Sequence, residues 1–320
     1  MRTTCLINNY NYEEYVLDAI QSALNQTVSF DEIIVVDDGS CDRSVELLKE
    51  NYSSCDRIKL IFKENGGQMS CFYEGFLKSS GDLIFFLDAD DLYCDNYLEE
   101  ALNLYKELNC DFLFCSYKDF NGKEEKIKLN YSKTTSLGYS VILASFVKTF
   151  KLMGNITSTL SIKRKFLAKI FPYPFMDDWR IEADRCLVFG SSLVGAKKAY
   201  CTQALVKRRI HGKNLYSPDL NSKAYLTIED TQRYQNILRD LRFKNFISNK
   251  MQNGDLYNYI TNEFRTIPLP TYVTTRIYID IVLSLPITIG EKIKKILSIY
   301  KYYFITIIKS KDRVKFIASE

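Results

Sequence analysis

The sequence lacks the motifs that mark several common classes of protein. Its nine cysteines include no CxxC pair, which argues against a zinc ribbon, and their scatter is typical of reduced thiols in the cytosol. No run reaches the roughly 18 uncharged apolar residues of a membrane span. The chain begins directly with a strand-like segment, so no secretory signal peptide is predicted.

Nucleotide-binding loops of the best-known kinds are also missing. The segment after the first predicted strand, "NNYNYE", has no glycine, which argues against a dinucleotide-dependent oxidoreductase with its GxGxxG turn. No GKS or GKT follows a glycine-rich loop, so the chain has no Walker loop. The net charge of +4 over 320 residues gives no general case for binding nucleic acid, which needs a clustered basic face.

Strand and helix patterns alternate along the first part of the chain. Single helices between strands predict a mainly parallel, Rossmann-like sheet flanked by helices. In such sheets ligands bind beyond the carboxyl ends of the strands. The predicted strands are 3–7, 32–38, 58–62, 82–88 and 110–117, and the predicted helices are 13–26, 43–50, 68–80 and 96–108. After about residue 121 the alternation weakens.

Three carboxylates follow an apolar strand in "LIFFLDADDLY", residues 83–93. They belong to Asp88, Asp90 and Asp91. Like charges packed this closely repel one another unless they share a cation or a proton. Mg²⁺ and Mn²⁺ prefer hard oxygen ligands and often take only a few of them from the protein, with phosphates and water completing the shell. The cluster therefore predicts a divalent metal together with the phosphates that it carries.

Four stretches in this order resemble the family 2 glycosyltransferases with a GT-A fold. They are "NNYNYEEY" from Asn8, "VVDDGSCDRS" from Val35, "ENGGQMSCFYEGF" from Glu64 and "FLDADD" from Phe86. The resemblance covers residues 1–120 strongly and 150–215 more weakly. It implies a bacterial-type transferase of polysaccharide biosynthesis. Such an enzyme moves a sugar from a nucleotide-diphosphate sugar, with UDP as the expected nucleotide, to an acceptor hydroxyl, inverting by single displacement.

The resemblance places the nucleotide-sugar site on the first three motifs. Asp37 is expected at the base or ribose, and Tyr10 is expected to stack on the base. Asn8 lies in the same predicted site. Asp38 is expected there too, with a turn or helix-cap role as the alternative. Gly67 and Gln68 are expected near the phosphates, because glycine allows close backbone approach and a helix N-terminus favours negative charge.

The metal and phosphate contacts are expected from the fourth motif and from "VKRRIHGKN". Asp90 is the first choice for direct contact with the metal. Asp88 is expected at the ribose or at a metal-bound water, and Asp91 beside it. The only histidine, His211, is a candidate third ligand, and Arg209 a phosphate contact. The alternative for His211 is an ordinary surface or core residue.

The general base is expected in "FMDDWRIEADRCLVFG". The acceptor hydroxyl must lose a proton during in-line attack, and in relatives the base lies at the start of a helix upstream of the Arg-x-His element. Asp184 and Asp178 are the two candidates, with Asp184 preferred for its spacing. Trp179 is a candidate platform for the acceptor sugar, with a core anchor as the alternative.

Two other functions stay open. Tyr73 stands where relatives usually carry Asn, which leaves room for a nucleotide-sugar-binding relative without catalysis. A DxD phosphatase also places its motif after an apolar strand. That class has Thr or Val two residues after the second Asp of the motif, where this chain has Leu92.

The chain is expected to divide near residue 215. Residues 1–120 would form the nucleotide-sugar half and 121–215 the acceptor half of a catalytic domain, with 216–320 a helical extension. Residues 291–320 hold eight Lys or Arg against three acids, with apolar residues at helical spacing. This pattern suits an anionic membrane face, such as the cytoplasmic face where a lipid-linked acceptor would lie. The alternative is a helix packed on the catalytic domain.

Overall fold

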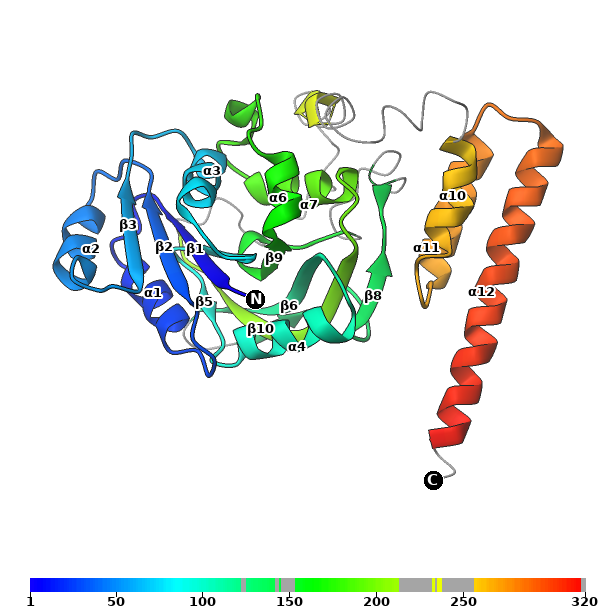
Figure 1. Ribbon diagram of the computed structural model, residues 1–320, viewed down its shortest axis with the longest axis horizontal. Coiled ribbons are helices and arrows are strands. Elements are labelled where there is room, and N and C mark those ends of the chain that lie inside the picture. Colours follow the sequence, from blue (N-terminus) through cyan, green and yellow to red (C-terminus); the bar gives the residue numbers. More distant parts are fainter. Residues whose placement is uncertain are drawn as a thin grey trace.

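The computed structural model describes residues 1–121, 125–141, 144, 153–212, 232–233, 235–237 and 256–317, with the side chains of the last range from 259 to 308. Figure 1 shows a central sheet with helices against it, and a group of helices at the right-hand edge. This arrangement confirms the predicted α/β class with a helical C-terminal part.

Parallel strands with helical crossovers form the first half of the sheet. The strands are β1 (Thr3–Asn9), β2 (Glu32–Asp37), β3 (Ile58–Phe62) and β4 (Leu83–Asp88), and the helices between them are α1 (Val16–Leu24), α2 (Ser44–Tyr52) and α3 (Gln68–Lys78). They lie in the order β3-β2-β1-β4, and all three pairings are parallel. The prediction from alternating patterns is therefore confirmed over this half.

Both faces of these strands are buried, as their continuous apolar runs require. Successive side chains on a strand point to opposite faces. Ile7 accordingly packs in the cluster that includes α1, and Leu6 packs in the cluster that includes Phe72 of α3. The second cluster also contains α6 (Arg164–Ile170) and α7 (Ala183–Leu193). The sheet is thus the middle of three layers (Figure 1).

The second half of the sheet departs from simple alternation. It contains β5 (Leu92–Tyr93), α4 (Tyr97–Glu107), β6 (Phe112–Phe120), β7 (Glu125–Lys128), β8 (Thr135–Gly138), the 3-10 helix η2 (Thr157–Thr159), β9 (Leu160–Lys163), the 3-10 helix η3 (Met176–Trp179) and β10 (Lys198–Arg209). Strand β9 lies antiparallel between β4 and β6. The next predicted strand, β6, is therefore not the neighbour of β4. Strand β10 runs parallel to β6.

The described residues from 256 onward form three helices: α10 (Leu256–Phe264), α11 (Tyr272–Ser284) and α12 (Ile289–Ile317). Phe264, Tyr278 and Ile299 belong to the same buried cluster as α6 and α7, so these helices share a core with one face of the sheet. The boundary expected near residue 215 falls outside the described residues and stays a prediction. Among the described helices, none is both long and apolar enough to cross a membrane.

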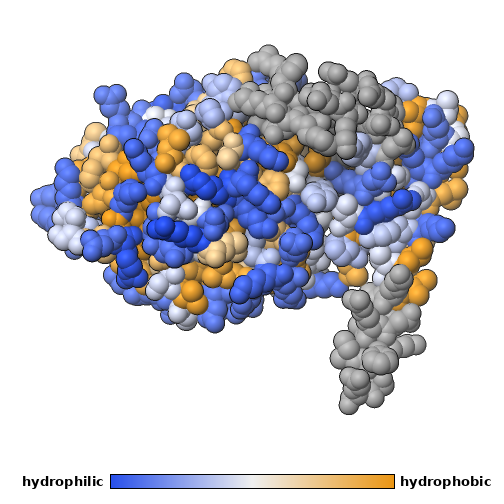
Figure 2. Space-filling model, viewed as in Figure 1, coloured by the Kyte–Doolittle hydropathy of each residue, from blue (hydrophilic) through white to orange (hydrophobic). Residues whose placement is uncertain are grey.

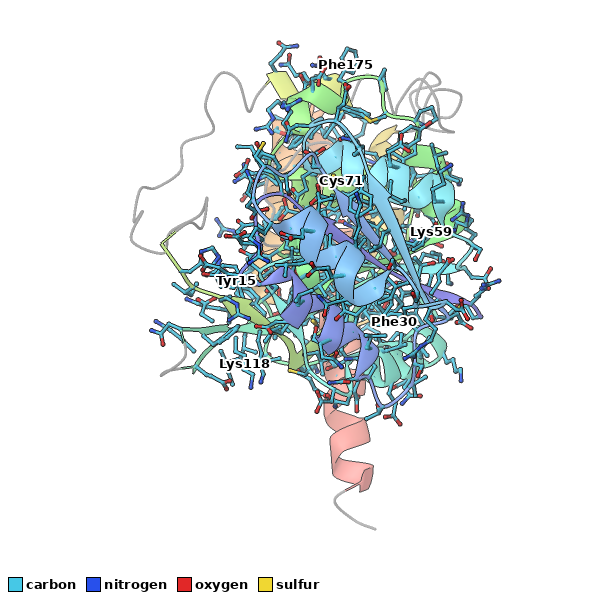
Figure 3. All side chains as sticks on the ribbon, turned by 90° about the vertical axis from the view of Figure 1, so that its left-hand side faces the viewer. Tyr15, Phe30, Lys59, Cys71, Lys118 and Phe175 are labelled. Carbon is cyan, nitrogen blue, oxygen red and sulfur yellow. The ribbon has the colours of Figure 1, made fainter. Side chains whose placement is uncertain are left out.

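Strand register brings the predicted site residues together at the edge of the sheet that is formed by the carboxyl ends of its parallel strands. Asn8 lies opposite Asp88 across the β1–β4 pairing, and Asn9 lies opposite Asp37 across β1–β2. Figure 3 shows Tyr15, which follows β1, and Lys118, near the end of β6, on the same side of the molecule. The carboxyl ends of the parallel strands lie on that side. Ligands of open α/β sheets bind beyond these strand ends, so the predicted site residues lie where a ligand is expected.

Candidate active site

The DADD turn and the end of β10 meet at this edge. The Nε2 atom of His211 lies 3.1 Å from Oδ2 of Asp90, and both side chains are about nine-tenths buried. The Nε atom of Arg209 donates to the backbone carbonyl of Asp90 at 3.1 Å. Residues 121 positions apart in the sequence thus form one pair, as was expected for Asp90 and His211.

The carboxylates of the turn are buried close together and repel one another. Burial, followed by the negative charge of Asp90, raises the pKa of Asp88 to about 7, although a hydrogen bond from Asn8 opposes the shift. Burial and the charges of Asp90 and Asp88 likewise raise the pKa of Asp91. Burial and these same carboxylates raise the pKa of the Tyr12 phenol, which therefore faces the cluster. A cation at this place would relieve the repulsion.

Asp91 lies beside Asp88, as expected, and both of its carboxylate oxygens accept hydrogen bonds. Its Oδ2 accepts a hydrogen bond from Ser158 Oγ at 2.6 Å, and its Oδ1 accepts one from the backbone N–H of Arg209 at 3.1 Å. Ser158 Oγ also accepts from the N–H of Asp88 at 3.1 Å. Asp91 therefore fixes the end of β10 against the DADD turn. Nothing in the sequence pointed to Ser158.

Aromatic rings surround the imidazole of His211. The ring of Tyr15 lies 4.7 Å from it and that of Tyr12 5.8 Å. The guanidinium of Arg209 lies over the Tyr15 ring at 4.8 Å, and its terminal nitrogen donates to Asp18 Oδ2 at 3.0 Å. The "NYNYEEY" loop after β1 thus supplies a wall of the site through Tyr12 and Tyr15, beyond the residues expected from the motif. Tyr10, the expected stacking residue, is 46% exposed.

Asp37 is buried and makes hydrogen bonds inside the protein, and its expected contact with the nucleotide stays a prediction. It is 1% exposed. Its Oδ2 accepts from Asn9 Nδ2 and from Ser40 Oγ, both at 2.7 Å, and its Oδ1 accepts from the N–H of Ser40 at 2.9 Å. This carboxylate holds the turn after β2 against the end of β1.

Asp38 fixes the NGG loop, which matches the turn alternative raised for it. Its carboxylate pairs with Lys63 Nζ at 2.5 Å and accepts from the backbone N–H groups of Gly66 at 2.9 Å and Gly67 at 2.7 Å. It is 3% exposed. The two glycine N–H groups that could have met a phosphate therefore point to Asp38.

Gly67 and Gln68 connect the NGG loop with the segment from Arg180 to Ala183. Gly67 has φ +85°, and a Cβ there would lie 2.4 Å from Cα of Arg180, so only glycine fits. The Nε2 atom of Gln68 donates to Asp88 Oδ1 at 2.9 Å, and its Oε1 accepts from the N–H of Ala183 at 2.9 Å. One amide thus connects the DADD turn with the first residue of α7.

Asp184 lies in the first turn of α7, beside that connection. Burial raises the pKa of its carboxyl to about 7, while hydrogen bonds from the N–H groups of Arg185 and Thr157 oppose the shift. The charge of Asp184 in turn contributes to the raised pKa of Asp88, so the two carboxyls are close neighbours. A carboxyl that titrates near neutrality has the pKa that a general base requires.

Asp178 and Trp179 lie on η3. Trp179 is 1% exposed, with the Arg233 guanidinium 4.3 Å from its ring centre. It is a core anchor, and no open ring face is left for an acceptor sugar. Asp178 accepts a hydrogen bond from Asn236 Nδ2 at 2.8 Å.

Tyr73, which stands where relatives usually carry Asn, packs against Phe171 with 5.3 Å between ring centres, so packing explains its position.

The described residues include no group of three or more His, Cys, Asp or Glu side chains arranged to hold a metal ion. The pair formed by Asp90 and His211 offers one oxygen and one nitrogen. Divalent cations that act on nucleotides commonly take few ligands from the protein. The donor set therefore fits a cation that is completed by phosphate and water.

Comparison with protein families now decides the class. Residues 4–171 match the family model "Glycosyl transferase family 2". An uncharacterized glycosyltransferase of Nostoc sp. is 32% identical over 248 residues, which cover 74% of this chain and 75% of the relative. The chain belongs to glycosyltransferase family 2. The predicted family, fold and enzyme class are thereby confirmed.

A second relative and a solved structure support the assignment of this glycosyltransferase to its family and fold. An uncharacterized glycosyltransferase of Haemophilus influenzae is 30% identical over 65% of this chain and 84% of its own length. Among solved structures, S. aureus TarS 1-349 in complex with UDP superposes with a TM-score of 0.53 at 17% identity, covering 98% of this chain and 92% of that one. At this identity the match shows a shared fold.

Proposed function

We propose that this glycosyltransferase moves a sugar from a nucleoside diphosphate sugar, with UDP as the nucleotide, to a hydroxyl of a glycan or of a lipid-linked acceptor. The observation that carries the proposal is the meeting of Asp88 and the Asp90–His211 pair with Asp184 at one edge of the sheet. Crystal structures of TarS with UDP and with UDP-GlcNAc support the choice of nucleotide.

Asp90 and His211 would hold a divalent cation, Mn²⁺ or Mg²⁺, in this proposal. Asp88 lies next to them and keeps its carboxylate oriented through Gln68, which suits contact with the ribose or with a cation-bound water. A bound cation would neutralise the charge on the departing diphosphate. Arg209 reaches the same turn and adds a positive charge beside the phosphates.

Asp184 would accept the proton of the acceptor hydroxyl. The hydroxyl oxygen would then attack the anomeric carbon from the face opposite the diphosphate, so that one displacement inverts the configuration. The pKa of Asp184, raised to about 7, supports this role, because roughly half of such carboxyls are ionised at pH 7 and the carboxylate takes up a proton readily. Asp178 is the weaker candidate, since it accepts a hydrogen bond from Asn236.

The catalytic domain in this proposal spans residues 1–215, and 216–320 form its extension. We place the enzyme in the cytoplasm, at the inner face of the membrane, where polysaccharide precursors on lipid carriers would be within reach. The basic C-terminal residues 291–320 support this location.

A panel of nucleotide sugars tests the donor assignment. Each sugar nucleotide is incubated with the protein and Mn²⁺, and released nucleoside diphosphate is measured. We expect metal-dependent release from a UDP-sugar. Metal-dependent binding without any release, across donors and with candidate acceptors, would favour a nucleotide-sugar-binding relative without catalysis. Release of inorganic phosphate from a phosphomonoester would favour a phosphatase.

A further inference from the structure

Helix α12 has an inner face that belongs to the fold. Ile299 is 1% exposed and lies in the core cluster. Arg265 donates to Ser298 Oγ at 2.8 Å, and the Tyr302 hydroxyl donates to the carbonyl of Ile267 at 3.0 Å. The packed-helix alternative from the sequence therefore describes this face. Removing the whole helix would uncover part of the core.

A second face of α12 carries large apolar side chains into solvent. We call this the outer stripe; its exposed fractions are Ile289 77%, Ile293 51%, Leu297 62%, Phe304 56% and Ile308 60%. Their spacing of four, four, seven and four residues keeps them on one side of a helix, over roughly 28 Å. Figure 2 shows apolar surface along the right-hand edge of the molecule, where Figure 1 places α12.

An exposed apolar stripe of this length marks an interaction surface, because soluble proteins seldom expose contiguous apolar area without a partner. The stripe begins at Ile289, before Glu291, the first residue of the segment that the sequence alone marked out. Near the start of α12, Lys292 Nζ donates to the carbonyl of Leu283 at 2.6 Å, which fixes this end of the helix to α11.

The charges beside the outer stripe have one sign. Lys294 and Lys301 lie next to the outer stripe around the circumference of the helix, and both are exposed. Residues 292–308 contain four lysines and no acid. A second copy of the same helix would bring lysines against lysines with no carboxylate between them, which opposes self-pairing. An anionic surface would satisfy the lysines and the apolar side chains together.

We propose that the outer stripe, with Lys294 and Lys301, is a docking surface for anionic lipid, on which the helix lies in the plane of the membrane. The proposal rests on the peripheral membrane contact proposed above and locates it on named residues. The inner face holds the helix to the catalytic part while the outer stripe enters the headgroup region. Sugar transfer is not needed for this contact.

Co-sedimentation with vesicles tests the docking surface. Full-length protein is mixed with phosphatidylcholine vesicles with and without phosphatidylglycerol. We expect pelleting only with phosphatidylglycerol and release at high salt. Leu297→Ser/Phe304→Ser is expected to abolish pelleting. Lys294→Gln/Lys301→Gln is expected to weaken it about fivefold for each lysine removed.

Matched controls carry the same changes elsewhere on the surface. Leu77→Ser removes an exposed leucine of α3, and Lys106→Gln/Lys169→Gln removes two exposed lysines; all should pellet like wild type. Wild-type protein that stays in the supernatant overturns the proposal, as does pelleting that the stripe variants leave unchanged. Sedimentation equilibrium that shows a dimer lost in Leu297→Ser/Phe304→Ser, without vesicle binding, would assign the stripe to a second copy.

Calorimetric titration of the same preparations with UDP and Mn²⁺ separates the two proposals. Intact nucleotide binding with no pelleting rejects the lipid surface alone. Pelleting with no nucleotide binding rejects the proposed donor alone.

Discussion

Replacing Asp184 by Asn should stabilise the protein while it removes catalysis. Burial raises the pKa of this carboxyl from an ordinary 3.8 to about 7. Between these values the unfolded chain has released its proton and the folded protein has kept it, so stability falls as the pH rises. Once the pH is above about 7, a pKa shift of about three units lowers the free energy of unfolding by roughly 4 kcal/mol.

The substituted side chain, a neutral amide, would carry no charge and would lose this pH dependence. Its carbonyl oxygen can still accept one of the two backbone hydrogen bonds that Asp184 accepts from Arg185 and Thr157. Losing the other costs on the order of 1 kcal/mol. We therefore expect Asp184→Asn to be more stable than wild type by about 1–3 kcal/mol at pH 8, with the advantage lost near pH 4.5.

Urea unfolding of the metal-free protein, followed by circular dichroism from about pH 4.5 to pH 8, measures the difference. Asp178→Asn is the matched control on η3 and should show no such gain. Turnover of Asp184→Asn should fall on the order of a hundredfold or more, with UDP binding close to normal, because the base acts on the acceptor. An equal stability difference at every pH would refute the reasoning from burial. Full turnover would refute the assignment of the base.

The remaining predictions concern the metal, the pH dependence of turnover and the contact between Gly67 and Arg180. Asp90→Ala should abolish metal-dependent turnover and weaken Mn²⁺-dependent UDP binding by about tenfold or more; wild-type turnover in this variant would end the metal assignment. Wild-type kcat/KM should rise about tenfold per pH unit below pH 7, as Asp184 loses its proton, and a flat profile measured at saturating metal would count against it. Gly67→Ala, with its Cβ 2.4 Å from Arg180, should lower stability by at least about 1 kcal/mol in urea unfolding, whereas Gly212→Ala, where a Cβ meets nothing within 4 Å, should not.

Local sequence patterns predicted the strands and helices of the first half of the sheet because each one carries its own signal, a continuous apolar run for strands such as β2 and β4 and helical spacing of apolar residues for α1. The apolar run of residues 83–87 and the acids after it set both β4 and the DADD turn. Strand β9 was not predicted, since its four residues pair with strands far away in sequence. A short strand of this kind is stabilised by tertiary contacts more than by propensity.

The candidate site was predicted in residue type more than in role. His211 and Asp90 were expected together and lie 3.1 Å apart. Asp37 was expected at the nucleotide, and Asp38 either there or in a turn. In the structure Asp37 accepts from the N–H of Ser40 in its own turn, and Asp38 accepts from the N–H of Gly67 in the NGG loop. Spacing in a sequence cannot distinguish a carboxylate that faces a ligand from one that holds a turn. Trp179 is buried against Arg233. Because Arg233 is distant in sequence, the residues around Trp179 could not indicate this burial.

Titration of UDP into the protein tests the central claim most directly. The claim is that Asp90 and His211 hold a divalent cation that binds the diphosphate of the donor. Calorimetry would compare wild type with Asp90→Asn, in Mn²⁺ and in EDTA. We expect wild type to bind UDP in Mn²⁺, with the affinity strongly weakened in EDTA and in Asp90→Asn. Equal affinity with and without metal, or an unchanged affinity in Asp90→Asn, would contradict it.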